Sequence, residues 1–176
     1  MPDHSIVVRP TRPEEAESLP PIERSAARAF LALPDLAWVA TDDVLSVDAH
    51  HHFIELGGSW VAELDGRIVG FVCAERYEAD LHVWEVSVVR EQQGQGAGTA
   101  LIEALKAHAA RRRLRRITLT TFRDVPWNEG FYRRLGFRVL AREELDLRLS
   151  YVLDLEDRQG MPVAQRCAMA FALEPA

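Results

Sequence analysis

The segment Gln93–Thr99 combines residue types and a spacing that could bind a phosphate group. Gly94, Gly96 and Gly98 alternate with other residues here, after a strand-like apolar segment and before a segment with helical periodicity. A glycine-rich turn in this position leaves several backbone N–H groups unpaired, and the dipole of the following helix adds partial positive charge. The segment therefore predicts a site for a phosphorylated ligand.

Two common phosphate-binding motifs do not fit this segment. The dinucleotide fingerprint G-x-G-x-x-G requires a third glycine where the chain has Thr99, and Gly98 comes one position early. A P-loop requires Gly-Lys-Ser/Thr at the end of the turn, and Gln93–Thr99 contains no lysine. The spacing therefore disfavours a dinucleotide-dependent oxidoreductase and a P-loop nucleotidase.

The segment does match Q/R-x-x-G-x-G/A, with Gln93, Gly96 and Gly98 at the fixed positions. It resembles the pyrophosphate-binding signature of the GNAT superfamily of acyl-CoA-dependent N-acetyltransferases. A second match follows further along the chain, where Tyr132 and Gly136-Phe137 form the Y-x-x-x-G-F pattern of the same family. The resemblance covers about residues 59–140 and is weaker before them.

The resemblance implies an α/β (α+β) fold, with a mixed, mostly antiparallel twisted sheet flanked by helices and a splayed central strand pair. We expect residues 1–176 to form one such domain, since this length is typical of a single core. Thr11, with Pro13 and Glu14 after it, predicts the first helix start, and Asp65-Gly66 predicts a tight hairpin turn. Periodicity predicts strands at 5–9, 60–64, 68–75, 81–88, 117–121, 137–141 and 166–173, and helices at 11–31, 44–56, 98–112 and 128–135.

The resemblance also implies acetyl-CoA as the cosubstrate and no metal. Main-chain groups at the end of strand 81–88 are expected to pair with the pantetheine arm, with the N–H of Val86 polarising the thioester carbonyl. Such a donor stabilises the oxyanion that forms during attack by an amine. The expected cofactor-binding residues are Val86, Ser87, Val88, Gln93, Gly94, Gln95, Gly96, Ala97, Gly98, Thr99, Asn128, Phe131 and Arg134.

Three side chains are candidates for proton transfer. Tyr132, carried over from the Y-x-x-x-G-F motif, is expected to protonate the departing CoA thiolate as a general acid. An alkyl ammonium must lose a proton before attack, and the strand offers His82 and Glu85 as bases. Strand alternation places His82 on the face of Val86 and Val88, whereas a β-bulge would bring in Glu85. Both candidates stay open.

One position departs from the family pattern. Many members carry an asparagine seven residues before the motif tyrosine, where it contacts the amide arm of the cofactor, and this chain has Val125 there. Asn128 could replace that asparagine one helical turn later, or it could cap the helix that contains Tyr132.

Composition excludes several other classes of function. A formal net charge of −6 argues against a nucleic-acid surface, and the arginines at 111–116 suit a solvated helix end. No segment has the length and apolar character of a signal peptide or a membrane span, so we expect a cytoplasmic protein with no membrane partner. Consecutive residues on a helix point about 100° apart, so the run His50-His51-His52 does not predict a metal site.

The sequence therefore predicts an N-acetyltransferase that moves an acetyl group from acetyl-CoA to a primary amine by direct attack in a ternary complex. A small-molecule amine is the expected acceptor, with a protein or peptide amine as the alternative. A non-catalytic acyl-CoA-binding regulatory module is an alternative from another class, and it would keep the glycine segment without needing Tyr132. A homodimer is compatible with the resemblance.

Overall fold

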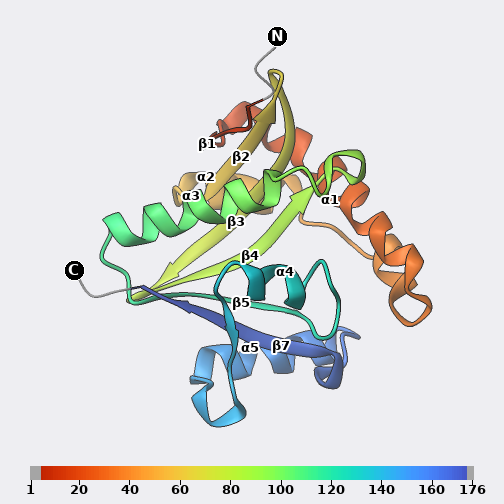
Figure 1. Cartoon of the computed structure of the whole chain (residues 1–176), viewed down its shortest axis with the longest axis vertical. Coiled ribbons are helices and arrows are strands. Elements are labelled where there is room, and N and C mark those ends of the chain that lie inside the picture. Colours follow the sequence, from red (N-terminus) through yellow and green to blue (C-terminus); the bar gives the residue numbers. More distant parts are fainter. Residues whose placement is uncertain (1–4, 174–176) are drawn as a thin grey trace. The chain divides into compact units, whose positions relative to one another are not determined.

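The structure is a computed structural model that describes residues 5–173 (Figure 1). Seven strands of this part of the chain form one sheet in the order β1-β2-β3-β4-β5-β7-β6. The parallel pair is β4–β5, whereas β1–β2, β2–β3, β5–β7 and β6–β7 are antiparallel. The mixed, mostly antiparallel α/β fold expected from the sequence is confirmed. The strands are β1 (Val7–Pro10), β2 (Ser59–Leu64), β3 (Arg67–Tyr77), β4 (Asp80–Val88), β5 (Arg116–Phe122), β6 (Arg138–Val139) and β7 (Arg166–Ala172), and the α-helices are α1 (Leu19–Ala27), α2 (Val47–Glu55), α3 (Ala97–Arg111), α4 (Glu129–Arg134) and α5 (Leu147–Arg158).

The chain divides into two compact units, and strands β3 and β4 contain residues of both. The first unit comprises the described residues up to Glu75 together with Trp84–Ala107, and the second comprises Arg76–Val83 and the chain from His108 onward. The expectation of a single domain over the whole chain stays a prediction.

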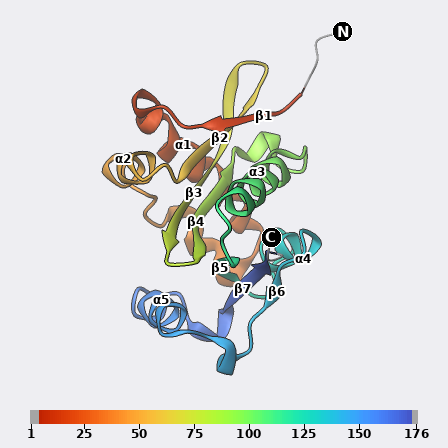
Figure 2. The same ribbon diagram turned by 90° about the vertical axis from the view of Figure 1, so that its left-hand side faces the viewer.

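In the first unit, helices cover both faces of the strands. Figure 2 shows α1 and α2 on one side of β2 and β3, and α3 on the other side. On the first side, residues of α1 and α2 pack on alternate residues of β2 and β3; this core cluster contains Leu19, Ile22, Phe53, Val61, Phe71 and Cys73. On the other side, Leu101 of α3 lies over Gly70 of β3. The period of two along the strands therefore separates the two helical layers.

In the second unit, β7 presents its two faces to different helices (Figure 2). Ala168 and Ala170 lie in a core cluster with Leu149 and Leu153 of α5. The ring of Phe171, on the opposite face of β7, lies 5.5 Å from the ring of Phe137, which follows α4. The parallel pairing of β4 with β5 joins Asp80–Val83 to Arg116–Leu119 within this unit.

The single helix expected over 11–31 is wrong. The chain forms a 3-10 helix at Pro13–Ser18, then α1, then a second 3-10 helix at Arg28–Ala32. Pro20 and Pro21 lack an N–H and fit only the first turn of a helix, so a new helix starts at Leu19.

Thr11 is not the cap that the sequence suggested. Its N–H donates to the backbone oxygen of Ser59 and its hydroxyl bonds the Ser59 hydroxyl, so Thr11 still belongs to the strand edge. The N–H of Arg12 instead donates to the carboxylate of Glu15 at 2.8 Å, one position later than expected.

Most other elements lie close to their expected positions. Helix α2 begins later than expected, because the Ser46 hydroxyl accepts the N–H of Ala49. The hairpin at Asp65-Gly66 is confirmed, with positive φ at both residues. The last strand is confirmed as β7, whereas α5 was not expected.

A close backbone approach at Gly58 provides a test of this fold. The N–H of Ala74 donates to the Gly58 oxygen at 2.7 Å, and a Cβ at Gly58 would overlap the backbone oxygen of Ala74. We expect Gly58→Ala to lower the free energy of unfolding by about 3 kcal/mol, measured by urea denaturation. The control is Gly130→Ala, whose Cβ would meet its nearest atoms at 3.6 Å and 3.9 Å and should not destabilise. Equal midpoints for the two variants would contradict this packing.

Candidate active site

The glycine segment forms a turn between β4 and α3 that is open to a ligand. Gly94 and Gly96 have φ values of 77° and 97°, which disfavour any other residue type. Among residues 5–173, only the Ile6 side chain lies within 4 Å of a Cβ placed on Gly96, and none lies within 4 Å of one on Gly94. Helix α3 starts at Ala97, so its first N–H groups have no partner within the helix. The turn is therefore suited to hold an anionic group.

The side chain of Gln93 ties this turn to β4 and α1. Its amide nitrogen donates to the backbone oxygen of Val88 at 3.1 Å and to that of Ala26 at 3.5 Å. Its amide oxygen accepts from the guanidinium of Arg90, and the backbone N–H of Arg90 donates to the hydroxyl of Ser25 at 3.0 Å. The end of β4, the turn and the second half of α1 are thus joined by direct hydrogen bonds.

The end of β4 lies unusually close to β3. A Cβ on Gly70 would come within 2.8 Å of the Ser87 backbone oxygen and 3.0 Å of Val88 Cγ2, so only glycine fits without a shift. The Ser87 hydroxyl donates to Glu85 at 2.7 Å, and alternation along the strand places these two side chains opposite that of Val88. Since Val88 lies on the α3 side with Gly70 and Leu101, Glu85 projects toward the side of α1 and α2.

His82 lies in the second unit and is 1% exposed. Its Nδ1 lies 2.9 Å from the Thr118 hydroxyl, and its ring lies edge-on to the ring of Tyr77. Burial, with repulsion from Arg148, lowers the pKa of His82 to about 3. The ring is therefore neutral at physiological pH, and it is a weak proton acceptor there. The role of His82 as a base stays a prediction, and this environment counts against it.

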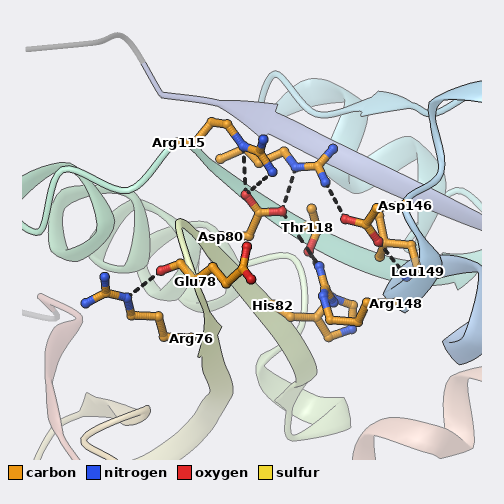
Figure 3. Close-up of polar contacts among 10 residues, drawn as sticks. Arg76, Glu78, Asp80, His82, Arg115, Thr118, Asp146, Arg148 and Leu149 are labelled. Atoms are coloured by element: carbon orange, nitrogen blue, oxygen red, sulfur yellow. Dashed lines mark hydrogen bonds and ion pairs between the residues drawn. The ribbon is translucent and has the colours of Figure 1, made fainter.

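A charge network surrounds Asp80 in the same unit (Figure 3). Its buried carboxylate accepts hydrogen bonds from Arg115 at 2.9 Å and from Arg116 at 2.8 Å, and Arg148 lies 3.8 Å away. Arg116 also pairs with Asp146, the N-cap residue of α5, at 2.7 Å. The network anchors the start of β4 to β5 and α5, and no motif in the sequence indicated it.

Helix α4 presents the motif tyrosine within an aromatic cluster. Tyr132 is 9% exposed, and its ring lies 5.0 Å from that of Phe131 and 5.6 Å from that of Phe137. Arg133 pairs with Glu129 at 2.8 Å, whereas Arg134 makes no ion pair with the residues that the structure describes. Arg134 is thus the guanidinium of this helix that remains available for a phosphate.

Asn128 does not cap α4 with its side chain. Its amide nitrogen donates to the Thr121 hydroxyl at 2.9 Å, and its φ and ψ are −112° and −98°. Its side-chain oxygen is buried and accepts no hydrogen bond from residues 5–173. A buried acceptor of this kind fits an amide N–H such as those of a pantetheine arm.

The predicted site residues fall into two groups. Glu85, Val86–Val88 and the turn belong to the first unit, and His82, Asn128, Phe131, Tyr132 and Arg134 belong to the second. The structure brings each group together within its own unit. Their combination into one site stays a prediction.

A family model described as the acetyltransferase (GNAT) family matches residues 25–137 of this chain, which is more than half of it. The chain belongs to the acetyltransferase (GNAT) family. It is 27% identical to the S-alkylcysteine N-acetyltransferase of Bacillus subtilis (strain 168) over 146 residues, covering 76% of this chain and 79% of the relative. The resemblance inferred from the two motifs is therefore confirmed.

Solved structures share this fold. The PaiA N-acetyltransferase of Thermoplasma acidophilum in complex with coenzyme A is 15% identical with a TM-score of 0.72, covering 96% of this chain and 99% of that one. A GNAT family acetyltransferase of Brucella melitensis in complex with acetyl-CoA is 23% identical with a TM-score of 0.60, covering 98% of this chain and 90% of that one. These similarities show the fold of the acetyltransferase (GNAT) family to which the family model assigns the chain.

The side chains of the three consecutive histidines do not point toward one common site. His50 is fully buried with its Nδ1 3.6 Å from the sulfur of Cys73, His51 is half-buried and His52 is exposed. Within residues 5–173, no group of three or more His, Cys, Asp or Glu side chains is placed to hold a metal ion. Nor does any helix in that range combine the length and apolar character required to cross a bilayer.

Substitution of Gly96 tests the turn as the cofactor site. We expect Gly96→Trp to abolish acetyl-CoA binding measured by calorimetry, because the indole would fill the space beside the N–H groups. The matched control is Gly160→Trp, since Gly160 also has a positive φ, 92°, with nothing within 4 Å of its Cβ position. Binding that survives in Gly96→Trp, or that is lost equally in the control, would contradict this assignment.

Proposed function

We propose that the protein transfers the acetyl group of acetyl-CoA to the amino group of a small molecule, with S-alkylcysteines as the first class to test. The observation that carries this proposal is the similarity to an S-alkylcysteine N-acetyltransferase over about three quarters of both chains. The open turn at Gly94–Gly96, the buried acceptor on Asn128 and the unpaired guanidinium of Arg134 support acetyl-CoA as the donor.

The proposed reaction is a direct transfer in a ternary complex. The deprotonated amine attacks the thioester carbonyl carbon, and the N–H of Val86 stabilises the oxyanion. The C–N bond forms to give a tetrahedral intermediate, whose C–S bond then breaks as Tyr132 gives its phenolic proton to the departing thiolate. The proton that the attacking nitrogen carries in excess returns the phenolate of Tyr132 to the neutral phenol. A carboxylate rather than His82 accepts the proton of the amine, because the pKa of His82 near 3 makes that ring a poor proton acceptor at neutral pH. Glu85 is the carboxylate among the two predicted bases.

The acceptor class is tested with a panel of amines. We expect CoA release, followed with a thiol reagent, to be fastest with S-methyl- and S-benzylcysteine, and mass spectrometry should find the N-acetylated product. N-blocked S-methylcysteine and a peptide with a free N-terminus are the controls. Acetylation of the peptide alone would replace the small-molecule acceptor by a protein amine, and binding of acetyl-CoA without any turnover would favour a regulatory module.

The proposed acid is tested by Tyr132→Phe. Loss of the hydroxyl should reduce kcat by about 10²-fold or more while the Kd for acetyl-CoA changes little, because the ring still packs on its neighbours. Phe137→Leu, which alters the same aromatic cluster without removing a hydroxyl, controls for packing. An unchanged kcat in Tyr132→Phe would remove the phenol from the mechanism.

A further inference from the structure

Glu23 of α1 is a carboxylate that neither motif includes. Its side chain is half-buried, and one carboxylate oxygen accepts the N–H of Leu45 at 3.0 Å. Within the described residues, no cation forms an ion pair with it. A carboxylate withdrawn from water without a counter-charge is costly, so Glu23 is unlike the other partly buried acids of this unit, such as Glu15 with its partner Arg9.

The position of Glu23 on α1 is fixed against the end of β4. Ser25 and Ala26, two and three residues further along α1, bond to Arg90 and to Gln93, and Gln93 bonds the Val88 oxygen as well. Glu23 thus lies on the segment of α1 that is joined to the strand expected to hold the thioester.

Glu23 and Glu85 lie near the same buried thiol. Burial raises the pKa of Cys73, and the charges of Glu85 and Glu23 raise it further. Leu45, whose N–H donates to Glu23, packs against the core cluster that contains Cys73. Cys73 faces α1 and α2 in the core cluster of the first unit, which is the side toward which Glu85 and Ser87 project. Glu23 on α1 and Glu85 on β4 therefore face the same region.

The groups around Glu23 leave it ready to titrate near neutral pH. Burial raises the pKa of Glu23 to about 7, against smaller opposing effects of the Leu45 N–H and of exposed Arg24. His50 of α2 is neutral at this pH, because burial lowers its pKa to about 4, and the Cys73 thiol stays protonated. Glu85 of β4 is a second carboxylate facing this region. A carboxylate tuned in this way is matched to proton transfer at physiological pH.

We propose that Glu23 binds the ammonium group of the acceptor and accepts its proton, with Glu85 as the second carboxylate that receives the cation. The proposal rests on the proposed N-acetyltransferase function. One proton moves from the substrate nitrogen to the free carboxylate oxygen of Glu23, which leaves a neutral amine and a neutral carboxylic acid. The amine then attacks the thioester, and the acid returns its proton to water after the product leaves.

The kinetic test compares Glu23→Gln with the wild type over pH 5.5–9. In the wild type, kcat/KM for an S-alkylcysteine should rise through an apparent pKa near 7 as Glu23 loses its proton. Glu23→Gln should lower kcat/KM at pH 8 by about 10²-fold and abolish the rise of kcat/KM through pH 7, with an unchanged Kd for acetyl-CoA. Glu17→Gln, on the exposed face of the first 3-10 helix, is the matched control and should leave the profile intact. The proposal would be overturned if the rise of kcat/KM through pH 7 persisted in Glu23→Gln but disappeared in Glu85→Gln.

A second test needs no substrate, so it separates this proposal from the proposed function. In protein with 13C-labelled glutamate, one carboxyl resonance should titrate near pH 7 and be absent from Glu23→Gln. The raised pKa means that ionised Glu23 destabilises the folded state as pH rises from 4.5 through 7. Glu23→Gln should therefore raise Tm at pH 8.5 and leave it nearly unchanged at pH 5. A resonance that titrates near pH 4, or a lower Tm at pH 8.5, would show an ordinary ion-paired carboxylate and refute the proposal.

Discussion

The amide side chain of Gln93 makes the contacts on which the first unit's part of the site depends. Its hydrogen bonds reach the end of β4 and the last turn of α1, while its own backbone begins the glycine turn. These hydrogen bonds therefore link the strand expected to hold the thioester, the turn suited to a pyrophosphate and the helix that carries Glu23. The glutamine at the start of the family motif acts here through its side chain as a structural link, whereas the main chain of the turn is the part expected to bind the cofactor.

Gly70 imposes the complementary constraint from the opposite strand. Because it has no side chain, β3 approaches β4 closely at Ser87 and Val88, beneath Leu101 of α3. Close packing on that side leaves Glu85 and Ser87 on the side of α1 and α2, so a polar pair lies where an amine is expected to react. The closely packed face of β4 lies against Gly70 and Leu101, and its opposite face carries the polar side chains of Glu85 and Ser87.

The parts of the fold that could be predicted from the sequence are those with local physical causes. The glycine turn, the Asp65-Gly66 hairpin and the helix of α3 follow from φ preferences and from periodicity over neighbouring residues. The continuous helix over 11–31 failed for a reason that is also local, because Pro20-Pro21 start a new helix. Helix α5 carried a usable signal that was not recognised: Asp146 as its cap, with Leu149, Val152 and Leu153 spaced along one face.

The site was less predictable, because the role of an acid or an imidazole depends on what surrounds it after folding. Asp80 and Glu23 are both acids withdrawn from water, yet three arginines approach Asp80 and none forms an ion pair with Glu23 among the described residues. These arginines are distant from Asp80 in the sequence and reach it only through the pairing of β4 with β5 and the docking of α5. His82 is the reverse case: its place on the strand suggested a base, whereas its burial lowers its pKa and counts against that role. A neutralised carboxylate stabilises the fold and is unsuited to exchange a proton at pH 7, whereas an uncompensated carboxylate costs stability and stays available for exchange. Solvation and counter-charge, rather than residue type or strand position, therefore separate the structural acid from the candidate base.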